Sequence, residues 1–166
     1  MLYVGIERVA SVTAKATLVL SSLFIALMAL HITLDVALRY FIGTSFQGTL
    51  EVVSFYYMVC AIFLSLAYVE HKREHICVDV VVNRLPESWH LPLYVFGCLL
   101  GILYFAMLGY QSGVDAWRAT QSQETAMANF TFYVWPSRWA LPLGFFAICI
   151  ATFANMIKAI AQGKAL

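Results

Sequence analysis

Four long apolar runs, separated by short polar segments, dominate the pattern of residues along this 166-residue chain. The runs cover residues 16–34, 50–69, 91–114 and 139–157, and Glu51, at the start of the second run, is the only Asp, Glu, Lys or Arg inside them. A helix of about 20 apolar residues crosses a hydrocarbon core about 30 Å thick. The pattern therefore predicts four transmembrane helices over roughly residues 16–40, 50–71, 90–114 and 136–158.

Composition supports a membrane protein over a soluble helical bundle. The chain is 62% hydrophobic and 11% charged, whereas soluble domains carry about 25% charged residues. A soluble bundle also needs polar outer faces on its helices, and the third apolar run offers almost none. The first run is longer than the apolar part of a signal peptide, so we expect a retained span. The prediction is an all-α integral membrane protein with one domain, residues 1–166.

The distribution of basic residues predicts the orientation. With four spans, both termini and the middle loop lie on one side of the membrane. Seven of the ten Lys and Arg residues fall on that side and three on the other. Because Lys and Arg concentrate in cytoplasmic segments, both termini are expected in the cytoplasm.

Two loops have apolar character of their own. Residues 78–85 in the middle loop are rich in valine and precede Pro86, which suits either a short interfacial helix between spans two and three or a plain polar hairpin. The sequence leaves both open. In the outer loop, residues 130–135 are apolar and aromatic, which predicts a segment that dips into the interface or packs against a partner.

A cluster of ionisable residues is predicted where the first two spans meet. His31, Asp35 and Arg39 are four residues apart and share one helical face, and Glu51 opens the next helix. Ionisable groups near the apolar region usually pair and face protein. Either Asp35 with Arg39 or Arg39 with Glu51 would tie the two spans together, and loss of Arg39 is expected to weaken assembly or transport. A proton relay is less favoured, because the other spans hold no further acidic residue at depth.

The sequence contains little evidence for a catalytic site or a bound cofactor. The string from His71 to His75 matches the H-x-x-E-H pattern of zinc peptidases, but no third zinc ligand is evident. The favoured interpretation is a polar, partly basic segment that anchors the end of the second span at the lipid headgroups. The four cysteines lack C-x-x-C spacing. His31 and His71 lie at opposite ends of their spans, on the order of 20 Å apart, too far for one haem. The sequence predicts no enzyme, metal site or cofactor.

A glycine pair in the third span indicates contact with other helices. Gly97 and Gly101 form a G-x-x-x-G motif, which lets another helix approach closely. The broken helices and midplane polar groups of transport sites have no evident counterpart. The chain is therefore expected to bind other membrane helices.

Several short motifs resemble one known family. They are Leu38-Arg39-Tyr40, Glu51 at the start of span two, His75-Ile76-Cys77-Val78-Asp79 after it, and Leu85-Pro86. In order and spacing they resemble the small membrane subunit, or Q subunit, of tripartite ATP-independent periplasmic (TRAP) transporters. The resemblance adds His75 and Asp79 to the candidate interface residues.

The resemblance implies a multi-pass protein of the bacterial inner membrane without catalytic residues or cofactor. A large multi-span subunit would carry the substrate and sodium sites, and a periplasmic binding protein would dock on the outer face and deliver an organic acid. The small subunit would be a scaffold that contacts the large subunit and membrane lipids, not nucleic acid. The alternative is a membrane anchor of a respiratory or redox complex, resting on the four histidines alone.

Overall fold

Helices make up almost the whole of the protein, which we describe from a computed structural model at residues 2–75, 82–126 and 131–164. Four helical stretches in this part of the chain are long and apolar enough to cross a membrane, which confirms the predicted fold class. In chain order, the elements are α1 (Leu2–Phe41), α2 (Thr49–Val52), the π-helical turn η1 (Val53–Tyr57), α3 (Met58–Lys72), the 3₁₀ turn η2 (Val82–Arg84), α4 (Glu87–Gln121), β1 (Thr125–Ala126), β2 (Phe132–Tyr133), α5 (Trp135–Arg138) and α6 (Ala140–Gln162).

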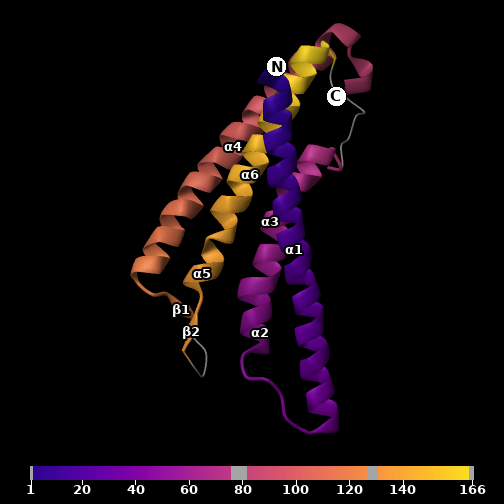
Figure 1. Ribbon diagram of the computed structural model, residues 1–166. Helices are drawn as coiled ribbons and strands as arrows, with labels where there is room; N and C mark the ends of the chain where they lie inside the picture. The colour runs from indigo at the N-terminus through magenta and orange to yellow at the C-terminus, as the bar shows by residue number, and fades with distance from the viewer. Residues whose placement is uncertain (1, 76–81, 127–130, 165–166) are drawn as a thin grey trace.

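The last helix, α6, forms the centre of the fold. It packs against α1, α3 and α4, and α4 lies on the side of α6 away from α1 (Figure 1). In the most apolar stretch of each span, 61% of the residues are buried for α5–α6, but only 6% for α1 and 6% for α4. Small side chains dominate the buried positions of α6, which allows close helix packing. They include Ala147, Ala151, Ala154 and Ala159.

One contact between α6 and α3 is unusually close. A Cβ atom placed on Gly144 would lie 2.2 Å from the carbonyl oxygen of Phe63 and 2.8 Å from its carbonyl carbon. The backbones of the two helices therefore touch at this point, and only glycine fits. Nearby, a Cβ on Gly109 of α4 would lie 3.3 Å from the Phe145 Cβ, so α4 also approaches α6 at a glycine.

The first helix is longer than predicted, because it begins at Leu2 and not near residue 16. Its 40 residues give a length of about 60 Å, twice the hydrocarbon thickness. Glu7, Arg8 and Lys15 lie on its first turns. Charged residues limit the apolar span, but they do not end a helix, so the hydropathy pattern alone understated the length.

A two-stranded hairpin closes the end of the molecule opposite the termini. Thr125 pairs with Tyr133 and Ala126 with Phe132. The Phe132 ring packs on Tyr56 of η1, with centroids 5.6 Å apart, and the Tyr56 hydroxyl donates a hydrogen bond of 2.6 Å to the Tyr133 carbonyl. The described part of the aromatic segment 130–135 thus packs on its own chain, where the sequence suggested the interface or a partner.

The middle loop is described only in part. Residues 76–81 lie outside the described residues. The candidate Asp79 is among them, as is much of the segment 78–85, for which the sequence left open an interfacial helix or a polar hairpin. The remainder forms the single turn η2, and His90 Nε2 lies 3.1 Å from the Val82 carbonyl oxygen.

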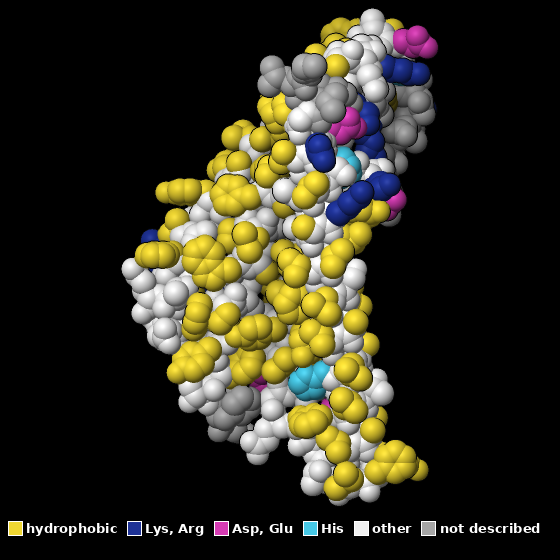
Figure 2. Space-filling view, viewed as in Figure 1, with side chains coloured by type: hydrophobic (Ala, Val, Ile, Leu, Met, Phe, Trp, Pro, Cys, Tyr) yellow, Lys and Arg dark blue, Asp and Glu magenta, His cyan; other side chains and the backbone are white. Residues whose placement is uncertain are grey.

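Apolar side chains cover the middle of the molecule, whereas most of the visible Lys and Arg side chains gather at the end that holds the termini (Figure 2). We call this the terminal end, and the end with the hairpin the loop end.

Candidate functional site

At the loop end, a buried carboxylate holds the connection between α1 and α2. Arg39 Nη2 donates to Asp35 Oδ2 at 3.0 Å, and the Phe46 backbone N–H donates to Asp35 Oδ1 at 2.7 Å. Asp35 is 4% exposed, whereas the Arg39 side chain is 68% exposed. Of the two pairs that the sequence allowed, the structure contains Asp35 with Arg39, and the pair lies within one helix.

At the loop end, aromatic contacts beside that carboxylate link the first two spans. His31 lies edge-on to Phe46 and to Tyr57, with centroids 5.7 and 5.8 Å away. Its Nδ1 is 3.3 Å from the Tyr57 hydroxyl. Asp35 therefore positions Phe46, and Phe46 and Tyr57 together enclose His31 between α1 and η1.

Glu51 occupies a different place from the one predicted by pairing with Arg39. It is half-buried beside the hairpin, where it lines a shallow hollow with Ser54, Phe55 and Ala126. Within the described ranges, Glu51 makes no ion pair. Its position next to β1 leaves it a candidate for contact with a partner at the loop end.

At the terminal end, polar contacts join the helices to one another. Lys158 Nζ lies 2.8 Å from Glu7 Oε1 and joins α6 to α1. The Asn155 amide donates to the Glu70 carbonyl oxygen at 2.8 Å, and the Glu70 carboxylate lies 3.4 Å from His75 Nε2. His75 is thus part of a helix-joining network. No group of three His, Cys, Asp or Glu residues suited to a metal ion is found in 2–75, 82–126 and 131–164.

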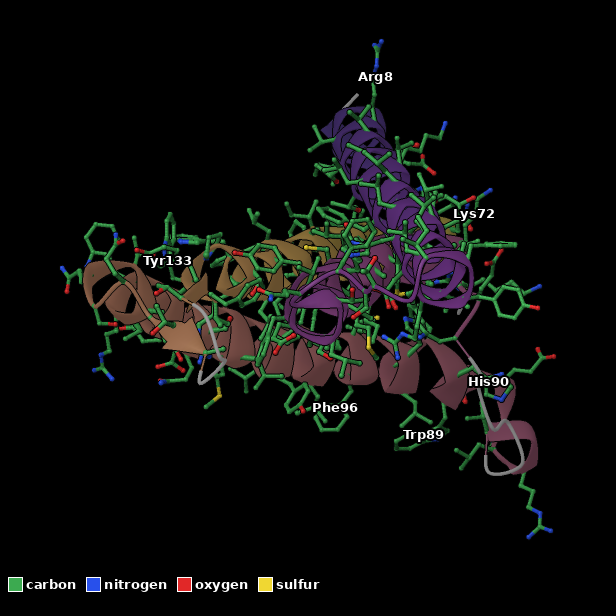
Figure 3. The ribbon with its side chains drawn as sticks, turned by 90° about the horizontal axis from the view of Figure 1, so that it is seen from below. Arg8, Lys72, Trp89, His90, Phe96 and Tyr133 are labelled. Atoms are coloured by element: carbon green, nitrogen blue, oxygen red, sulfur yellow. The ribbon has the colours of Figure 1, made fainter. Side chains whose placement is uncertain are left out.

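The glycine motif of the third span faces outward. No heavy atom lies within 4 Å of a Cβ built on Gly97 or on Gly101. The part of α4 around these two glycines exposes several large apolar side chains. Phe96 and Trp89 point away from the other helices (Figure 3). This face is open to lipid or to another helix, whereas Gly109 and Gly144 make the close contacts inside the chain.

An ion pair fixes the hairpin to the start of the last span. Arg138 Nε and Nη2 each donate to a carboxylate oxygen of Glu124 at 2.5 Å. These hydrogen bonds hold the pKa of Glu124 below its ordinary value of 4.5. A lowered pKa in the folded state means that the pair stabilises folding above the unfolded-state value, and that this stabilisation disappears as the pH falls through the folded-state pKa.

We therefore expect Glu124→Gln to lower the thermal unfolding midpoint in detergent at pH 7, and the gap from the wild type to close as the pH falls well below 4.5. The effect is small, about 1 kcal/mol or less, because solvent screens both side chains. Glu74→Gln, an exposed change outside the helices and at the terminal end, serves as the control. A gap that stayed constant down to pH 3 would contradict the assignment.

Sequence reasoning missed a pocket at the loop end with a volume of about 270 Å³. It opens between η1, α3, α4, α5 and α6, and its lining residues come from three separate parts of the sequence, so no local motif indicates it. Its lining residues are Phe55, Val59, Phe63, Ser112, Asp115, Val134, Ser137, Arg138 and Leu141.

Comparison with known proteins identifies a family. The sequence profile of the family described as "Tripartite ATP-independent periplasmic transporters, DctQ component" matches residues 28–162. No curated protein and no solved structure matches the chain.

Proposed function

Because this chain belongs to the DctQ component family of tripartite ATP-independent periplasmic transporters, we propose that it is the small, fixed membrane subunit of a sodium-coupled transporter. In this proposal, a large multi-span subunit binds and moves the substrate, and a periplasmic binding protein delivers it. The substrate class that we propose is an organic acid. The chain is a scaffold beside the large subunit in the bacterial inner membrane and does not bind substrate.

The division of its surface supports a scaffold role. The core along α6 is completed by contacts inside the chain, whereas α1 and α4 leave most of their apolar side chains exposed. The charged contacts described above lie towards the two ends of the helices. Such a molecule offers broad apolar faces to lipid and to another membrane protein.

The positive-inside rule supports the orientation that we propose. Most of the visible Lys and Arg side chains gather at the terminal end (Figure 2), and we propose that this end lies in the cytoplasm. The loop end then faces the periplasm and presents Tyr40, Phe41 and Tyr133, which are 82%, 79% and 46% exposed. We propose this end as part of the docking surface for the binding protein.

Co-purification tests the proposal. The tagged chain, expressed with the products of neighbouring genes and extracted in mild detergent, is expected to retain a large multi-span protein in a one-to-one ratio. Gly101→Leu is expected to reduce that recovery at least several-fold, because the added side chain projects into the open face of α4. Recovery of the chain alone, or with a redox protein that shows haem absorbance, would refute the proposed function.

A matched change separates loss of contact from loss of folding. Gly5 also has no heavy atom within 4 Å of its Cβ position, so Gly5→Leu adds the same side chain without a clash. Gly5 lies near the first turn of α1, away from the open face of α4. Both variants should elute as monodisperse protein when expressed alone. Equal recovery of the large protein with Gly101→Leu and with wild type would remove the α4 face from the interface and leave the family role intact.

A further inference from the structure

We propose that the pocket at the loop end binds one phospholipid that carries both a phosphate and a primary ammonium group. The pocket has an apolar wall for part of an acyl chain and two opposite charges at its mouth for the headgroup. This proposal concerns the chain itself and does not depend on the identity of the transported substrate.

The apolar wall follows the second span towards the middle of the membrane. Phe55, Val59 and Phe63 are four residues apart along η1 and α3, and Leu141 of α6 lies across from them in the same pocket. Side chains at this spacing occupy successive turns of one helical face. They form an apolar track that begins at the loop end and suits a hydrocarbon chain better than a polar solute.

Arg138 has donors left for a phosphate. A guanidinium group carries five N–H donors, and the bonds to Glu124 use Nε and one donor of Nη2. The Arg138 side chain is 43% exposed and lines the pocket. Glu124 therefore fixes one edge of the guanidinium, and the other edge remains open to the phosphate oxygens, which arginine binds well.

Asp115 supplies the acceptor for the ammonium group. It lines the same pocket from α4 and receives hydrogen bonds of 3.2 and 3.4 Å from Gln111 Nε2. A carboxylate accepts about four hydrogen bonds, so Asp115 can also accept from a primary ammonium. Gln111 lies one turn away and holds the carboxylate in place.

The balance of charge at the mouth favours a zwitterion over an anionic lipid. Asp115, Glu124 and Arg138 together carry one net negative charge. A headgroup with a phosphate but no ammonium would raise the net charge at the mouth to two negative charges. In a zwitterionic headgroup the ammonium cancels the phosphate charge, so the net charge stays at one. Arg118 is exposed one turn further along α4 and does not line the pocket.

The pocket also lies at a depth that suits a headgroup. Trp117, on α4 two residues after Asp115, is 57% exposed, and Trp139 follows Arg138 directly and donates through Nε1 to Thr120. Exposed tryptophan rings favour the headgroup level of a bilayer. The charged mouth is therefore at the surface of the membrane and the apolar wall runs inward.

Native mass spectrometry of the delipidated chain, alone and with its co-purified large subunit, provides the test. We expect about tenfold more phosphatidylethanolamine than phosphatidylglycerol to bind at equal concentrations, because only the first offers an ammonium group to Asp115. Asp115→Asn should reduce this preference to near equality. Equal binding of the two lipids by wild type, or an unchanged preference in Asp115→Asn, would overturn the proposal.

Two serine variants separate filling of the pocket from a general effect on folding. Ser112 and Ser65 both bond to the carbonyl three residues earlier in their own helix, at 3.1 and 2.9 Å, and only Ser112 lines the pocket. Ser112→Phe should abolish the specific lipid adduct, and Ser65→Phe should retain it. Loss of the adduct on addition of the large subunit would show that a partner helix occupies the pocket, and this result would overturn the lipid assignment without affecting the proposed function.

Discussion

Gly144→Leu is expected to separate α6 from α3 and to prevent recovery of the folded chain. Even the Cβ atom would lie 2.2 Å from the Phe63 carbonyl oxygen, and a backbone atom cannot move aside as the end of a side chain can. Overpacking a core costs about 1–3 kcal/mol and occasionally more. We expect the upper end or beyond, because α6 contacts α1 and α4 as well as α3, so a shift at one contact disturbs the others.

Size-exclusion chromatography in mild detergent and thermal unfolding would measure this effect. The matched control is Gly97→Leu, which adds the same side chain to a helical glycine with no heavy atom within 4 Å of its Cβ position. The control should behave as wild type when expressed alone. A monodisperse Gly144→Leu protein with a wild-type unfolding midpoint would show that the α3–α6 contact is looser than described.

Asp35→Ala is expected to detach the connection between α1 and α2. The substitution leaves the Phe46 N–H and the Arg39 guanidinium without their shared acceptor. A hydrogen bond to a charged group contributes about 1.5–3 kcal/mol, so exchange of the Phe46 amide should accelerate by at least about tenfold. Hydrogen exchange measured by mass spectrometry on peptides that cover residues 42–48 would report it.

Arg39→Ala provides the comparison. Because the Arg39 side chain is 68% exposed, its ion pair is screened and contributes about 0–1 kcal/mol. The Phe46 N–H keeps Asp35 as its acceptor in this variant, so exchange should change little. Faster exchange in Arg39→Ala than in Asp35→Ala would mean that the ion pair, and not the backbone hydrogen bond, holds the connection.

The sequence predicted what depends on hydropathy and local spacing. The four spans follow from apolar runs that no soluble helix would tolerate. The spacing of four residues allowed the Asp35–Arg39 pair, but it left the pairing of Arg39 with Glu51 equally open, and the observed pair does not join the two spans. The start of α1 escaped prediction, because its polar first turns are compatible with a helix outside the hydrocarbon. The five-residue π-helical turn η1 also lacked a signal, since Val53–Tyr57 contains neither glycine nor proline.

Contacts between distant segments were not predictable from one sequence. The G-x-x-x-G spacing marked Gly97 and Gly101, yet inside the chain the close approaches occur at Gly144 of α6 and at Gly109 of α4. Gly109 forms a second G-x-x-x-G motif with Gly113, so the same spacing occurs on an outward face and on a packed face of one helix. The packing of Phe132 on Tyr56 likewise joins residues that are remote in the chain. Spacing shows which residues share a helical face, but it does not show which helix that face meets.

The central position of α6 has a consequence for the order in which the protein is made. Ribosomes synthesise α1, α3 and α4 first, and within the described part of the chain the main helix contact of α4 is with the segment that follows it. Until α6 enters the membrane, α1 and α3 form a pair and α4 has little to pack against. The newly inserted protein therefore passes through a stage in which α4 is surrounded mainly by lipid, and a ribosome that stalls before Trp135 leaves a product with an incomplete core.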